Sequence, residues 1–64
     1  MPVAYIRYKY NMPKIKRGLK VLYDGKKGRI VSFLGNYIHI KMEEDGRSFR
    51  VHPKDDKLVI KYND

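Results

Sequence analysis

The stretch from Gly18 to Val31 constrains the fold more than any other part of the chain. It places two short runs, rich in β-branched and aromatic residues, on either side of a lysine-bearing turn. Asp24-Gly25 is a turn dipeptide and Gly28 can take a positive φ angle, so the stretch predicts a β-hairpin. The rest of the chain supplies what such a hairpin needs to close into a small barrel.

Alternating apolar and polar residues, bounded by turn signals, predict five short strands at residues 19–23, 28–34, 37–42, 48–52 and 58–62. Gly35-Asn36 suits a two-residue type II′ turn. Pro53 ends the fourth strand, and residues 54–57 are expected to form one 3₁₀ turn before the last strand. No stretch keeps a 3.6-residue period over ten residues, so we expect essentially no α-helix. The predicted fold class is all-β and antiparallel.

The second predicted strand contains a conflict that requires a bend. The two-residue turn that follows it sets Phe33 opposite Ile38. It also sets Val31 opposite Ile40, which points Ile30 away from the core although Ile30 has the character of a core residue. Strongly bent strands change their inward face at a bulge. We therefore predict a bend at Val31 or at the serine that follows it.

Length and composition limit the chain to one small domain. It has 64 residues and no cysteine, so neither disulfides nor a thiolate zinc site can supplement its core. No apolar run approaches the ~20 residues of a membrane span, and the first fifteen residues hold no signal-peptide core. These features predict a cytoplasmic monomer that does not contact membranes and needs no cofactor.

The formal net charge is +8, and its distribution is uneven. Residues 1–31 hold nine Lys and Arg against Asp24 alone, whereas residues 32–64 hold six basic and six acidic side chains. A basic surface raises the local concentration and the association rate of polyanions. The clustering therefore favours nucleic acid as a partner, although a basic surface can also serve solubility alone.

Residues 1–15 are predicted to form an added strand or a loosely held arm. Tyrosines alternate there with Arg7 and Lys9, a composition that stacks on bases while neutralising phosphates. An equally weighted alternative is that Ile6 and Tyr8 cover the open end of the barrel.

Lys26 and Lys27, followed by Arg29, are the best candidates for phosphate contacts, because lysines on a short rigid turn can approach a nucleic-acid backbone. Such contacts position a protein without specifying sequence. The predicted nucleic-acid-binding residues are Arg7, Lys9, Lys16, Arg17, Lys20, Lys26, Lys27, Arg29, Tyr5, Tyr8 and Tyr10.

A second surface is predicted on the outward side of the third and fourth strands. The register closest to the loop ends sets His39 opposite His52 and Lys41 opposite Arg50. With Tyr37 these residues form either a secondary contact patch or a solvated face. Two histidines without a third ligand make a poor metal site, so no metal is expected.

The strand pattern of residues 16–62 resembles an SH3-like small barrel, and residues 16–34 resemble the KOW-type motif within that group. The motif is a basic, glycine-containing turn, then a glycine and a hydrophobic residue two positions later, roles that Gly28 and Ile30 fill. Leu19 departs from the aspartate usual after the first glycine, and the loop is shorter than usual. The resemblance implies contacts with RNA, DNA or neighbouring proteins. Compact basic barrels of this size are also common among phage and mobile-element proteins.

These observations favour a small basic protein that contacts nucleic-acid phosphates without strong sequence specificity. The alternative is a protein-interaction module, phage-encoded and docking on a host transcription or translation complex through exposed aromatics. No enzymatic activity is expected, because no nucleophile has an adjacent base and no loop has a phosphate-cradling form. An oligomeric enzyme is the third hypothesis, since the plasmid-encoded type of dihydrofolate reductase builds one active site from four small barrels.

Overall fold

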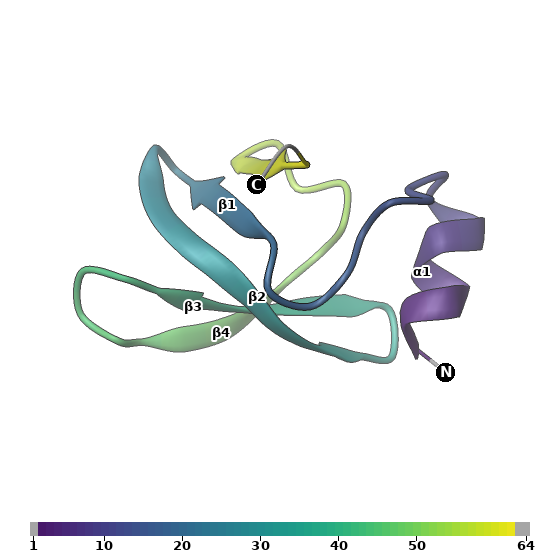
Figure 1. Ribbon diagram of the computed structural model, residues 1–64, viewed down its shortest axis with the longest axis horizontal. Coiled ribbons are helices and arrows are strands. Elements are labelled where there is room, and N and C mark those ends of the chain that lie inside the picture. The colour runs from purple at the N-terminus through teal and green to yellow at the C-terminus, as the bar shows by residue number, and fades with distance from the viewer. Residues whose placement is uncertain (1, 63–64) are drawn as a thin grey trace.

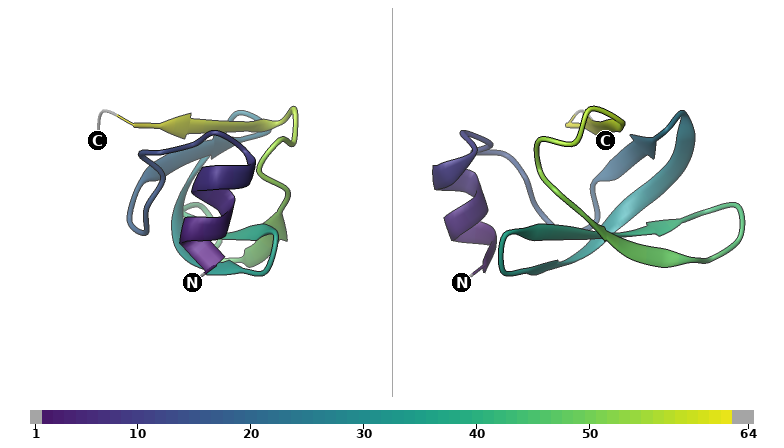
Figure 2. Two further views of the ribbon diagram at one scale, coloured as in Figure 1. Left: turned by 90° about the vertical axis from the view of Figure 1, so that its right-hand side faces the viewer. Right: turned by 180° about the vertical axis from the view of Figure 1, so that it is seen from behind.

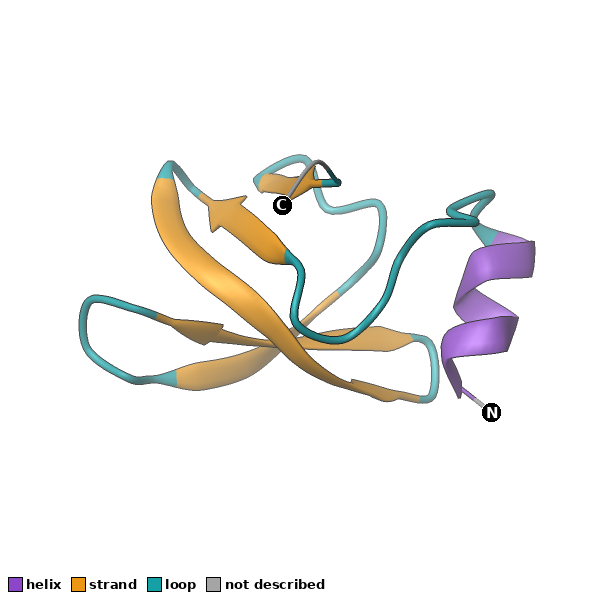
Figure 3. Ribbon diagram, viewed as in Figure 1, coloured by secondary structure: helices purple, strands orange, loops and turns teal. Residues whose placement is uncertain are grey.

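The turn dipeptides divide the chain into strands as the sequence predicts. The computed structural model describes residues 2–62, which contain five antiparallel strands and one short helix (Figure 1). These elements are α1 (Pro2–Lys9), β1 (Lys20–Tyr23), β2 (Lys26–Leu34), β3 (Tyr37–Met42), β4 (Ser48–Val51) and β5 (Leu58–Lys61). The strands form one sheet in the order β4-β3-β2-β1-β5. Figure 3 shows the long β2 curving between β1 and the β3–β4 hairpin.

Two tight turns set the register of the central hairpins. Asp24 and Gly25 both have positive φ angles, +54° and +81°, as a type I′ turn requires. Tyr23 is therefore directly opposite Lys26. Gly35 has a φ of +57°, and the β2–β3 pairing begins on either side of the Gly35-Asn36 turn. The predicted bounds of β3 match those observed.

The predicted bend in β2 is a β-bulge at Val31. Phe33 is opposite Ile38 as expected, but the register shifts between Ile30 and Ser32, and Ile30 rather than Val31 is opposite Ile40. Val31 is the extra residue, so Ile30 returns to the inward face, where it is almost completely buried. The conflict seen in the sequence is thus resolved where the bend was expected.

The N-terminal segment is a helix, so the prediction of a strand and of no α-helix is wrong. Helical spacing places Val3, Ile6 and Tyr10 on one face, and Ile6 is fully buried. The helix ends in a Schellman motif: Asn11 has a φ of +53°, and the Met12 N–H donates to the Arg7 carbonyl over 3.0 Å. Asn11 and the proline that follows Met12 therefore end a helix, where they had been interpreted as ending a strand.

Helix α1 covers one end of the folded sheet, beside the β2–β3 turn (Figure 2). This agrees with the alternative that Ile6 covers the open end, but Tyr8 does not share that role because it is 90% exposed. Helix and strands enclose a single core. The core residues are Ile6, Ile15, Leu19, Val21, Ile30, Ile38, Ile40, Met42 and Val51.

Two successive tight turns replace the 3₁₀ turn predicted before the last strand. The Asp55 N–H donates to the His52 carbonyl, and the Leu58 N–H donates to the Asp55 carbonyl, each over 3.0 Å. The Asp55 carboxylate accepts the Lys57 N–H at 2.9 Å and so closes the second turn. Two separate turns form because Asp55 holds the chain through its own side chain between them.

Candidate nucleic-acid interface

Charge is sorted between strands and turns. Within residues 2–62, all five strands lack Asp and Glu. The acidic residues lie in the connections instead, at Asp24, Glu43, Glu44, Asp45, Asp55 and Asp56. Alternation along the strands directs most of the strand cations to the outward face, away from the core. These outward cations are Lys20, Lys27, Arg29, Lys41, Arg50 and Lys61.

Four of these cations are directly opposite one another across four adjacent strands, and we call them the basic row. Lys20 of β1 is opposite both Lys61 of β5 and Arg29 of β2. Arg29 is in turn opposite Lys41 of β3. Directly opposite residues project to the same face of an antiparallel pair, and all four residues are exposed. The backbone register therefore produces a continuous line of positive charge across the sheet.

Two shallow hollows lie along the basic row and share Glu43. The cations lining the first are Lys20, Lys27 and Lys61, and those lining the second are Arg29 and Lys41. The Glu43 N–H donates to the Lys27 carbonyl over 3.0 Å, which fixes the start of the β3–β4 loop against β2. Glu43 therefore supplies the carboxylate that the two hollows have in common.

Lys26 and Lys27 do not form a basic turn, because the turn is Asp24-Gly25 and both lysines belong to β2. Alternation sends Lys27 to the outward face, whereas Lys26 lines the pocket on the opposite side; both also line a hollow with Glu43 and Glu44. Gly28 does not take a positive φ. It is buried, and a Cβ atom there would lie 2.9 Å from the Lys41 carbonyl oxygen. Gly28 thus allows β3 to approach closely.

The predicted register of the β3–β4 hairpin is wrong by two residues. His39 is opposite Arg50, not His52, and Lys41 is opposite Ser48, not Arg50. The loop closes earlier than expected because Gly46, with a φ of +72°, allows Met42 and Arg47 to pair. The inward face is unaffected, since a shift of two residues preserves the alternation.

The residues of the predicted secondary patch divide into two groups. Lys41 belongs to the basic row. At the other end of β3, the Arg50 guanidinium lies 5.8 Å from the centre of the Tyr37 ring, and the His52 ring lies 6.2 Å from it. His52 also approaches the Tyr10 hydroxyl at 3.3 Å, and His39 approaches the Ser32 hydroxyl at the same distance.

The predicted arm residues lie on or after α1, and several are engaged within the chain. Arg7 Nε donates to the Ile15 carbonyl over 2.9 Å. Lys9 Nζ donates to the Tyr5 hydroxyl over 3.0 Å, and this bond raises the pKa of Lys9. Tyr8 is the most exposed aromatic side chain of the described residues. The remaining cations, Lys16 and Arg17, are exposed in the segment between α1 and β1.

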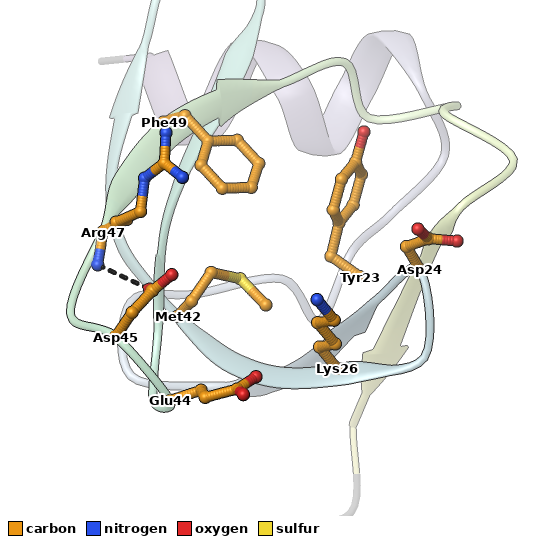
Figure 4. Close-up of a pocket in the computed structure, with 8 residues that line it drawn as sticks. All are labelled: Tyr23, Asp24, Lys26, Met42, Glu44, Asp45, Arg47 and Phe49. Atoms are coloured by element: carbon orange, nitrogen blue, oxygen red, sulfur yellow. Dashed lines mark hydrogen bonds between the residues drawn. The ribbon is translucent and has the colours of Figure 1, made fainter.

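A second hollow region lies on the other side of the sheet, between the β1–β2 turn and the β3–β4 loop (Figure 4). Tyr23 and Phe49 form aromatic walls, with their ring centres 5.3 Å apart. Partial burial raises the pKa of the Tyr23 hydroxyl, and the neighbouring Asp55 carboxylate, which accepts a hydrogen bond from this hydroxyl over 3.2 Å, raises it further. The charged lining residues are Asp24, Lys26, Glu44, Asp45 and Arg47, so the rim carries both signs of charge.

The structure joins predicted residues that the sequence had separated. Lys20 and Arg29 were predicted in the primary site and Lys41 in the secondary patch, whereas the register places all three in the basic row. Lys61 was missed, because its position depends on the pairing of β5 with β1. The alternation of residues 58–61 was the available signal for an outward Lys61.

Comparisons with known proteins leave the family open. The chain matches none of the protein-family models, curated proteins or solved structures with which it was compared. Among residues 2–62, no helix has the length and apolar character needed to cross a membrane. The same residues contain no group of three or more His, Cys, Asp or Glu side chains that could hold a metal ion.

Proposed function

We propose that the protein binds the phosphate backbone of nucleic acid through its outward sheet face, as a cytoplasmic monomer and without strong sequence specificity. The basic row carries this proposal. Like charges directly opposite each other destabilise a sheet, and here the arrangement extends across four neighbouring strands. An anionic ligand offsets that repulsion, and Lys and Arg contacts to phosphates position a protein without reading bases.

The proposal includes the fold, which we assign to the SH3-like barrels with a KOW-type motif. The number and antiparallel order of the strands and the bulge in β2 support this assignment. Gly28 and Ile30, the two motif positions, are both buried in β2 beside the basic row. The motif therefore has a structural role that leaves the adjacent Arg29 free to face outward.

A salt-titrated binding assay with labelled oligonucleotides tests the proposal. A row variant combines Lys20→Gln, Arg29→Gln and Lys41→Gln. Each lost phosphate contact removes about 0.9 from the slope of log K against log salt on duplex DNA. The slope should therefore fall by about 2 to 3, and affinity near 0.1 M salt should fall at least about ten-fold.

A matched control removes the same charge elsewhere, through Lys14→Gln, Lys54→Gln and Lys57→Gln, all exposed positions outside the row. Its salt slope should change by less than about one. Equal losses in the two triple variants would show that net charge alone drives binding. Wild-type protein that binds no nucleic acid at low salt would refute the proposal.

A protein-interaction surface is the second candidate function, because Tyr8 is 90% exposed on the outer side of α1. Tyr5, on the same helix, is 45% exposed, and tyrosines are favoured at the centres of interfaces. If the protein acts through a protein partner, Tyr8→Ser should abolish binding to that partner and the row variant should keep it. If the protein acts through nucleic acid, the row variant should lose binding and Tyr8→Ser should keep it.

A further inference from the structure

The geometry of the basic row bears on which form of nucleic acid the protein binds, an inference that rests on the proposed function. Adjacent strands lie about 4.8 Å apart, so four strands place the backbones of Lys61 and Lys41 about 14 Å apart. Hydrogen-bonded strands hold this spacing without a loop or a hinge. The strand backbones at the two ends of the row are therefore held at a separation of at most about 14 Å, measured along the curved sheet, and each carries a flexible lysine side chain.

That separation is close to the distance between the two phosphate backbones that border a groove of a duplex, whereas a single strand has only one backbone. The major groove of B-form DNA is about 12 Å wide. In both DNA and RNA duplexes, each groove is bordered by two backbones at a fixed spacing. A row about 14 Å long can place Lys61 against one backbone and Lys41 against the other. A flexible single strand offers only one line of phosphates, which would have to be ordered on binding.

The surroundings of the row also lack the platform that single strands require. Single-strand binders stack bases on aromatic rings beside their cationic groove. On the outward face the residues next to the row are Lys27, Leu22 and Val59 toward the β1–β2 turn. Toward the other end they are Ser32 and His39, which contact each other.

The exposed tyrosines of the described residues lie away from the row or are occupied. Tyr62 follows Lys61 in the chain, but it lines a hollow with residues 11–14. The Tyr37 ring has the Arg50 guanidinium and the His52 ring as neighbours. Tyr5 and Tyr8 belong to α1, which covers the end of the sheet beside the β2–β3 turn (Figure 2). A strand of bases lying along the row would therefore meet aliphatic side chains, Lys27, Ser32 and the half-buried His39 ring, which contacts the Ser32 hydroxyl, and none of the exposed tyrosines of residues 2–62.

We infer that the ligand of the basic row is double-stranded nucleic acid, held by phosphate contacts to both of its backbones. Duplexes also have the higher density of phosphate charge, one per about 1.7 Å of axis in B-form DNA. A rigid row of cations gains more electrostatic binding energy from a duplex of this charge density than from an extended single strand. DNA and RNA duplexes share the required chemistry, and the experiment distinguishes them.

The test measures dissociation constants of the full chain for four labelled ligands of equal length at one ionic strength: duplex DNA, duplex RNA and a single strand of each. At least one duplex should bind at least about ten-fold more tightly than its single strand. Single strands that bind as tightly as both duplexes would overturn the inference and leave the proposed function intact. No binding to any of the four ligands would overturn both.

Two end variants add a measurement that a uniform loss of affinity for all ligands would not change. Lys41→Gln and Lys61→Gln each remove the cation at one end of the row, so either should reduce the ratio of single-strand to duplex dissociation constants to about three or less. The matched control is Lys54→Gln, an exposed cation outside the row and its two hollows, which should keep the wild-type ratio. End variants that preserve the ratio would show that the row contacts one backbone only.

Discussion

At the scale of single residues, Gly28 shows why a position can be identified while its role is not. The sequence suggested that Gly28 has a positive φ. In the structure its φ is not positive, and a glycine is needed because no side chain fits there. An added Cβ would lie 2.9 Å from the Lys41 carbonyl oxygen and 3.1 Å from the Met42 sulfur. A close approach between β2 and β3 depends on tertiary register, which the local sequence does not contain.

Gly28→Ala should therefore destabilise the protein by about 1–3 kcal/mol, the usual cost of overpacking a buried site. The Lys41 backbone cannot move without disturbing the hydrogen bonds of β3, so relaxation is limited. Urea denaturation followed by circular dichroism measures the change. Gly46→Asn is the control, because Gly46 has open space around it and asparagine tolerates its φ of +72°. Equal stability of Gly28→Ala and wild type would contradict the packing argument.

Tyr23→Phe should change the stability of the protein at alkaline pH. The raised pKa means that the folded state keeps the Tyr23 proton above pH 10.0, the ordinary value, where the unfolded chain loses it. This contribution is fully present below pH 10 and is lost as pH rises further. Between pH 9 and 11, the urea midpoint of wild type should therefore fall more steeply than that of Tyr23→Phe.

Tyr8→Phe is the control for this experiment, because it removes the hydroxyl of a tyrosine that is 90% exposed. Its urea midpoint should follow that of wild type across the same pH range. A Tyr23→Phe protein that loses stability with the wild-type slope would show that the hydroxyl does not contribute through its proton.

At the scale of elements, predictions held where neighbouring residues decide the structure. The turn dipeptides determined the bounds of β3, and the conflict between the turn register and Ile30 located the bulge in β2. The prediction for the N-terminal segment was wrong because its residues are compatible with both the two-residue period of a strand and the 3.6-residue period of a helix. Ile6 and Tyr8 would share a face in a strand, but a helix buries one and exposes the other, and only packing against the sheet selects between them.

Helix α1 should be stabilised mainly by Ile6 and hardly by Tyr8. Ile6 is fully buried among core residues, so Ile6→Ala should cost about 2–5 kcal/mol, a large share of the stability of a small domain. Tyr8→Ala, on the same helix, should change stability by less than about 0.5 kcal/mol. Chemical denaturation of both variants tests this. Similar costs for the two would mean that α1 does not pack as described.

At the scale of the whole molecule, the division of charge along the chain differs from its division in space. All of the net charge comes from residues 1–31, yet Lys41 and Lys61 of the neutral half stand in the basic row. Among the described residues, the acids of this half lie in the connections between strands. Strand alternation could predict that Lys20 and Arg29 face outward, but joining them to Lys41 and Lys61 needs the registers of three strand pairs.

The basic row should cost the free protein stability at low salt, because like charges are directly opposite in three successive strand pairs. Arg29→Thr with Lys41→Thr removes two of these three like-charge pairs, leaving Lys20 opposite Lys61, and places β-favouring residues on the strands. At 10 mM salt the double variant should melt about 4 °C above wild type, the shift that roughly 0.5–1 kcal/mol produces in a chain of this size. Added salt should raise the wild-type melting temperature and close the gap, since it screens the repulsion.

The double variant should also bind duplex DNA less tightly, so stability and binding change in opposite directions. A double variant that melts below wild type at every salt concentration would show that these cations stabilise the sheet, and the reason for expecting an anionic ligand would be lost.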